Sequence, residues 1–267
     1  MADGGVVESV KGMHPSFLNV IKQKERVRER LKGVKNKIGV YSAKGGVGKT
    51  SISINIAYTL MRMGFRVGLL DADIDCPNVT TFLNISDKMD LSGFPLRPIE
   101  KDGVRIASTS MIVDDNKRPI IWRGPMIAKM LGDFFENTDW GELDYLIIDL
   151  PPGTSDSPLS ILQLVDMRGF ILVTTPSRVS ASDSMRSGLM VRRLGAAILG
   201  VVENMSEGDV PSRATVELAK ELDAKVLGRV GFDRIFKDMD NIGGVPVLRD
   251  ERIYERFRGI LEDLVGR

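Results

Sequence analysis

The chain contains the stretch Ala43-Lys44-Gly45-Gly46-Val47-Gly48-Lys49-Thr50. An apolar run from Ile38 to Tyr41 precedes it, and a helical pattern from Ser51 to Met63 follows it. This order of strand, glycine-rich loop and helix is the context in which backbone N–H groups converge on phosphate oxygens at a helix N-terminus. The stretch therefore predicts a phosphate-binding loop, or P-loop, that opens an α/β domain.

Each residue type in this loop suits one part of ATP and its Mg²⁺. Glycines permit backbone conformations with positive φ, so successive N–H groups can turn toward the phosphates. Lys49 is expected to reach the β and γ phosphates, and Thr50 to place its hydroxyl on Mg²⁺. The predicted nucleotide contacts are Gly45, Gly46, Val47, Gly48, Lys49, Thr50 and Ser51.

Short β-rich runs alternate with helical stretches along the chain. The runs cover residues 38–41, 66–70, 104–107, 145–150, 170–174 and 198–202. Several are apolar on successive residues, as in Tyr145-Leu146-Ile147-Ile148, so both faces of the sheet must be covered. The pattern predicts an α/β fold of the P-loop NTPase kind, a doubly wound, mostly parallel sheet with helices on both faces.

Acidic residues end two of these predicted strands. Asp71-Ala72-Asp73 follows the run at 66–70, and Asp149 lies near the end of the run at 145–150. Because the carboxyl ends of parallel strands meet at one edge of a sheet, these carboxylates should lie beside the P-loop. We predict a magnesium site formed by Thr50, Asp71 and Asp149, partly through metal-bound waters.

The composition of the 267-residue chain limits its organisation and partners. A leader with a short helix, residues 1–34, is expected to precede one ATPase domain, residues 35–267. Because 37 Lys and Arg nearly balance 36 Asp and Glu, neither nucleic acid nor a membrane is an expected partner. No apolar run approaches the roughly 20 residues that span a bilayer, and no signal-peptide pattern opens the chain. The expected location is therefore the cytoplasm.

Three further features receive structural interpretations. Residues 250–267 predict an amphipathic helix whose apolar stripe packs against the domain rather than binding a membrane. His14 precedes a proline and is expected in a turn. The single cysteine, Cys76, excludes an intramolecular disulfide and is interpreted as a small loop residue.

Several segments resemble one group of ATPases. The second loop lysine, Lys44, is the mark of the deviant P-loop of the MinD, ParA and Mrp group. The segments at 122–126, 140–154 and 201–206 narrow the resemblance to the Mrp-type ATPases, a family of iron–sulfur cluster carriers. The similarity runs from about Lys37 to about Leu248, which is most of the chain.

The resemblance implies a homodimer that encloses ATP between its subunits and hydrolyses it slowly. Lys44 would reach the nucleotide of the opposite subunit, and Asp73 would orient or deprotonate the attacking water. Lys44, Lys49 and Asp73 are therefore the candidate catalytic residues. Asn204 follows a predicted strand, and its amide both donates and accepts hydrogen bonds, so it is the candidate reader of adenine.

The chain departs from the family where a cluster would be held. Family members carry a C-x-x-C pair after the segment that corresponds to 203–206, but the residues Glu207 to Arg213 contain no cysteine. Because a cluster commonly needs about four thiolates and a dimer would supply only two copies of Cys76, a bound iron–sulfur cluster is doubtful. The client could be an iron–sulfur apo-protein or another protein. A positioning ATPase like ParA or MinD, and a nucleotide-binding adaptor, stay open as alternatives.

Overall fold

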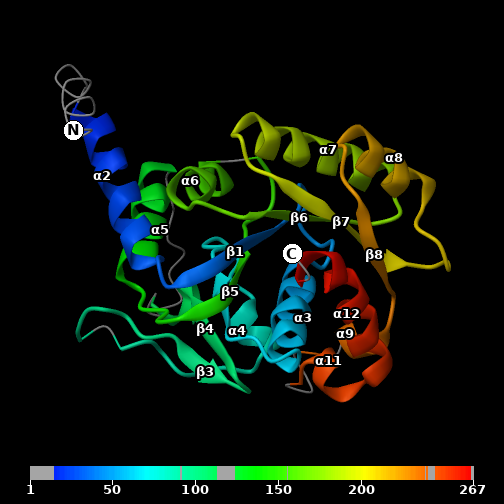
Figure 1. The fold of residues 1–267 in the computed structure, drawn as a ribbon, viewed down its shortest axis with the longest axis horizontal. Coiled ribbons are helices and arrows are strands. Elements are labelled where there is room, and N and C mark those ends of the chain that lie inside the picture. The colour runs from blue at the N-terminus through cyan, green and yellow to red at the C-terminus, as the bar shows by residue number, and fades with distance from the viewer. Residues whose placement is uncertain are drawn as a thin grey trace.

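A single sheet organises the chain in the computed structural model, which describes residues 15–90, 92–112, 124–154, 156–237, 239 and 244–265. Its eight strands follow the order β3-β4-β2-β5-β1-β6-β7-β8 (Figure 1). All neighbouring strands are parallel except β3 and β4. The predicted α/β fold is confirmed. His14, Trp122 and Arg123 lie outside the described residues.

Eight runs of residues form the sheet. They are β1 (Val34–Tyr41), β2 (Val67–Asp71), β3 (Ile99–Lys101), β4 (Val104–Ser108), β5 (Leu143–Asp149), β6 (Gly169–Thr174), β7 (Ile198–Ser206) and β8 (Val226–Gly231). The six predicted runs correspond to β1, β2 and β4 to β7. The sequence reasoning missed β3 and β8. The signal for β3 was the pair Asp102-Gly103, whose φ angles of 48° and 82° suit a tight hairpin turn.

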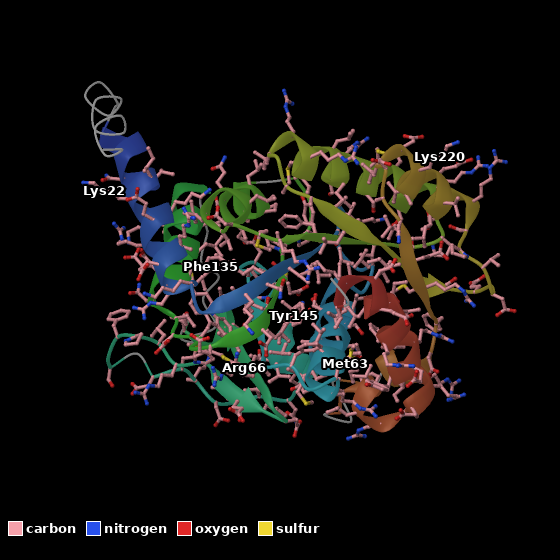
Figure 2. All side chains as sticks on the ribbon, viewed as in Figure 1. Lys22, Met63, Arg66, Phe135, Tyr145 and Lys220 are labelled. Atoms are coloured by element: carbon pink, nitrogen blue, oxygen red, sulfur yellow. The ribbon has the colours of Figure 1, made fainter. Side chains whose placement is uncertain are left out.

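Helices cover both faces of this sheet. They are α2 (Pro15–Arg30), α3 (Lys49–Arg62), α4 (Val79–Phe82), α5 (Gly124–Asn137), α6 (Asp156–Leu164), α7 (Arg178–Arg193), α8 (Arg213–Glu221), α9 (Arg234–Lys237), α11 (Pro246–Arg249) and α12 (Glu251–Val265), with a short 3₁₀ turn at Thr109–Met111. Figure 1 shows α3, α11 and α12 on one side of the sheet and α5 to α8 on the other. Figure 2 labels two side chains of the interior, Phe135 on α5 and Tyr145 on β5, which are 0% and 4% exposed.

The terminal helix α12 completes the core on the α3 side. Its apolar stripe is buried, and it consists of Ile253, Phe257, Ile260, Leu261 and Leu264. The helix contacts β8 and α3. The prediction that this stripe packs against the domain is confirmed. Within the described residues, no helix is long and apolar enough to cross a membrane.

Helix α2 is longer than the short surface helix predicted in the leader, because it begins at Pro15. It packs against α5 and α6. Val27 in this helix is fully buried, and Leu31 just beyond its end is 2% exposed. An ion pair of 2.6 Å joins Arg26 Nε to Glu136 Oε1 at the end of α5. These contacts attach the helix directly to the domain formed by the sheet and its other helices.

Candidate functional site

The P-loop lies where three strand ends meet. Strand β1 leads into the loop, and its neighbours β5 and β2 end in Asp149 and Asp71. The register pairs Asp149 with Val40 on one side and with Asp71 on the other. The sheet therefore brings both acidic strand ends to the edge that carries the P-loop.

The loop is shaped to receive an anion. Gly46 and Gly48 have φ angles of 79° and 81°, conformations that favour glycine. Gly48 is the N-cap of α3, and none of the described side chains caps this helix. Its first N–H groups are therefore available to a phosphate. Lys44, Gly45 and Gly46 are exposed.

Three side chains from the start of α3 contact the carboxylate of Asp149. It is fully buried, and its Oδ2 accepts a hydrogen bond of 2.7 Å from Thr50 Oγ1. Its Oδ1 accepts one of 2.7 Å from Ser53 Oγ. The ammonium of Lys49 lies 2.9 Å from Asp149 Oδ2. The sequence reasoning missed Ser53, although its place four residues after Lys49 on a helix puts it on the same face.

The ammonium of Lys49 is poorly satisfied. The side chain is 7% exposed, and it makes an ion pair with Asp149. None of its N–H groups, however, forms a well-directed hydrogen bond with a described residue. A buried ammonium in this state is costly, and the oxygens of a phosphate would satisfy it. This observation fits a nucleotide better than a purely structural ion pair.

Asp71 faces the backbone of the loop that follows β2. It is fully buried, and its Oδ2 accepts from Val79 N at 3.0 Å, while its Oδ1 accepts from Asp73 N at 3.2 Å. Burial, followed by the nearby charge of Asp149, raises the pKa of Asp71 to about 7. The carboxyl group thus shapes the loop that carries Asp73.

Asp73 lies at the same edge and is 6% exposed. Its Oδ1 accepts a hydrogen bond of 3.2 Å from Cys76 N. Burial raises its pKa, and the positive charge of Lys49 opposes that shift. A carboxylate with a raised pKa beside a phosphate site is suited to accept a proton from water.

The remaining residues that the sequence analysis singled out lie in different surroundings. Lys44 is exposed and forms no ion pair with the described residues. The Ser51 hydroxyl lies 3.5 Å from Met239 Sδ. Cys76 is exposed in the loop after β2. Among the described residues, no group of three or more His, Cys, Asp or Glu side chains is arranged to hold a metal ion.

The end of β7 contacts the P-loop. Asn204 is 8% exposed, and its Nδ2 donates to the Val47 carbonyl oxygen at 2.8 Å. The preceding residue, Glu203, accepts from Ser206 Oγ at 2.8 Å and from Ser212 N at 2.9 Å. Burial would raise the pKa of Glu203, but these hydrogen bonds lower it below its ordinary value. The sequence reasoning assigned Asn204 to adenine and did not foresee its bond to the loop.

A family model agrees with this site. The model described as "ParA: NUBPL iron-transfer P-loop NTPase" matches residues 33–265. The chain belongs to this family. The iron–sulfur cluster carrier protein of Methanocaldococcus jannaschii is 38% identical over an alignment of 258 positions, which covers 91% of this chain and 88% of that protein. The protein of the same name from Methanococcus maripaludis is 34% identical over an alignment of 264 positions, which covers 92% of this chain and 89% of that protein. The resemblance to Mrp-type ATPases is confirmed.

Two solved structures of similar fold are complexes with a nucleotide. A nucleotide-binding protein from Archaeoglobus fulgidus in complex with ADP is 29% identical, with a TM-score of 0.73 over 88% of this chain and 96% of that one. The septum site-determining protein MinD of Pyrococcus horikoshii, complexed with Mg-ADP, is 22% identical, with a TM-score of 0.65 over 86% and 96%. The second likeness concerns the fold alone.

Proposed function

We propose that this NUBPL-family chain is an ATP-binding and ATP-hydrolysing homodimeric switch that serves iron–sulfur assembly. One observation carries the proposal: the buried, incompletely satisfied ammonium of Lys49 beside Thr50 and Asp149, at an uncapped helix N-terminus. This arrangement places positive charge and free N–H groups where a triphosphate would lie. The ADP complex of the Archaeoglobus fulgidus protein supports a nucleotide here.

The donor set fits Mg²⁺ as well as phosphate. Mg²⁺ prefers oxygen ligands, and Thr50 and Asp149 supply a hydroxyl and a carboxylate 2.7 Å apart. Thr50 would exchange its bond to Asp149 for the metal, and Asp149 would hold a metal-bound water. Asp71 would contribute to the outer shell of the metal. When bound, Mg²⁺ would neutralise charge on the phosphates.

Hydrolysis would depend on Asp73 and on the two loop lysines. Asp73 would orient or deprotonate the attacking water, since it lies at the same edge of the sheet as the P-loop and burial raises its pKa. Lys49 would neutralise the β and γ phosphates from the same subunit, and Lys44 would do so from the opposite subunit. The exposed position of Lys44 suits a contact that forms only when two subunits close.

The relatives are named iron–sulfur cluster carriers, but this chain has too few cysteines to hold a cluster in the usual way. The sequence has one cysteine, and Cys76 lies in the loop after β2 rather than near Ser212, where β7 leads into α8. A dimer of this chain would supply two thiolates, fewer than a cluster commonly needs. We therefore propose that the switch acts on a protein client, such as an iron–sulfur apo-protein, whose own residues hold the metal.

Replacing Lys44 by alanine tests the homodimeric switch. With a non-hydrolysable ATP analogue and Mg²⁺, the wild-type chain should double its mass in light scattering, and Lys44→Ala should stay largely monomeric. ATP turnover should fall at least about tenfold, because the variant loses one positive charge that would stabilise the transition state. Lys220→Ala, an exposed lysine on α8, is the control and should behave like wild type (Figure 2). Dimerisation and turnover of Lys44→Ala at wild-type levels would contradict the proposal.

A further inference from the structure

The carboxyl end of β7 reaches across β6 to the P-loop. Asn204, 8% exposed, donates from Nδ2 to the Val47 carbonyl oxygen over 2.8 Å. A hydrogen bond from a buried amide stabilises the backbone carbonyl that accepts it, and leaving that carbonyl buried and unpaired would cost more than the bond contributes. The bond therefore constrains the main chain of the loop at Val47.

This constraint determines where the next N–H group points. The Val47 carbonyl and the Gly48 N–H belong to one planar trans peptide, so they point in opposite directions. With the carbonyl bound to Asn204, the Gly48 N–H faces away from β7. That group lies at the start of α3, among the N–H groups that a phosphate would accept. If the peptide turned over, a carbonyl oxygen would face the phosphates instead.

The glycine at 48 is adapted to this contact. A Cβ atom added there would lie 2.1 Å from Asn204 Nδ2, so the amide occupies the space that a side chain would need. The φ angle of 81° also disfavours other residues. Gly48 and Asn204 are therefore packed as a pair.

The strand end that carries Asn204 is itself fixed. Met205 has a φ angle of 56°, which is uncommon for a residue other than glycine. Glu203 holds the same segment through its bonds to Ser206 Oγ and Ser212 N, of 2.8 Å and 2.9 Å. Strained backbone of this kind persists where the surrounding contacts determine it, and it gathers at functional sites.

We propose that Asn204 is a positioning residue of the phosphate loop, which aims the Gly48 N–H at the phosphates by holding the Val47 carbonyl. The inference rests on the proposed nucleotide-binding function and adds a task that does not involve the base. It requires that Asn204 contribute to the affinity for a triphosphate group even when no nucleoside is attached to it. A residue that only reads adenine contributes nothing to a ligand without a base.

Inorganic tripolyphosphate with Mg²⁺ separates these two roles. The full chain is titrated with this probe and with ATP by calorimetry, as wild type, Asn204→Ala and Asn204→Leu. Alanine deletes the donor without adding charge, and leucine deletes it while keeping most of the volume. Both variants should bind tripolyphosphate and ATP about tenfold more weakly, the effect of roughly one hydrogen bond.

The control is Asn137→Ala. Asn137 also donates from Nδ2 to a backbone carbonyl, that of Asp133, over 2.6 Å, at the end of α5. It should leave both affinities unchanged. All variants are measured below their melting temperatures, and either Asn204 variant suffices if the other does not fold.

Each outcome decides the question. An equal loss of affinity for tripolyphosphate and for ATP in the Asn204 variants supports the positioning role. Weaker ATP binding with unchanged tripolyphosphate binding overturns it, because Asn204 would then act on the base alone. Unchanged binding of both ligands overturns it too. A wild-type chain that binds neither ligand would instead contradict the proposed function, independently of Asn204.

Discussion

Lys49→Met should reduce ATP hydrolysis by about 10²- to 10³-fold, the range measured when one preorganised group that stabilises a transition state is removed. Methionine keeps the length of the apolar stem and loses the ammonium. In the wild-type chain that ammonium is buried 2.9 Å from Asp149 Oδ2, without a well-directed hydrogen bond. ATP binding should weaken as well, since the lysine is expected to touch the phosphates before and during hydrolysis.

Phosphate release and calorimetric titration with ATP measure these two effects. Lys220→Met on α8 changes an exposed lysine in the same way and should match wild type. Because Asp149 keeps its bonds of 2.7 Å from Thr50 and Ser53, the Lys49→Met chain should still unfold cooperatively. A folded Lys49→Met chain with wild-type turnover would refute the role of Lys49.

Asp73→Asn should abolish most of the turnover while leaving ATP binding nearly intact. Asparagine keeps the shape, and its Oδ1 can still accept the hydrogen bond from Cys76 N, which measures 3.2 Å in the wild-type chain. It cannot accept a proton from water. General-base catalysis contributes about 10²- to 10⁴-fold, so turnover should fall by that order.

Asp75→Asn is the matched control, because Asp75 lies in the same loop but is exposed. Single-turnover phosphate release and ATP affinity are measured side by side for both variants. Asp75→Asn should behave like wild type. If Asp73→Asn hydrolyses ATP as fast as wild type, then Asp73 is not the base, and a nucleotide-binding adaptor becomes the better description.

Much of the site could be predicted because it follows from local patterns. The glycines, Lys49 and Thr50 are adjacent in sequence, and parallel strands necessarily place their carboxyl ends at one edge. From that rule the position of Asp149 beside the P-loop could be predicted without knowledge of the strand order. In the observed strand order β5 lies between β1 and β2. Asp149 at the end of β5 therefore lies next to the strand that leads into the P-loop, and Asp71 is its neighbour on the other side.

Contacts between distant segments could not be predicted. The bond from Asn204 to Val47 joins residues 157 positions apart, and it depends on how β7 ends rather than on any motif. The sequence indicated an amide near the nucleotide but not which of its atoms the protein itself uses. Strand β8 was missed because Gly228 interrupts its apolar run; a Cβ at that position would lie 2.6 Å from Ile260 Cγ1 of α12. Only the packed helix explains that glycine.

The length of α2 was missed for a similar reason. Its sequence from Pro15 to Arg30 is rich in charge and has few apolar positions. The ion pairs of Arg26 with Glu136 and of Lys24 with Asp166, at 2.6 Å and 3.0 Å, depend on α5 and on the segment after α6. Such pairs are individually weak, so the buried Val27 and Leu31 provide most of the attachment.

The most direct test of the nucleotide-driven switch is phosphate release from ATP by the full chain, with Mg²⁺ and again with EDTA. The account predicts slow, saturable turnover that requires Mg²⁺, because Thr50 and Asp149 would act through the metal. Turnover should return when Mg²⁺ is restored. Absence of ATP binding and turnover in Mg²⁺ by a folded chain would contradict the account.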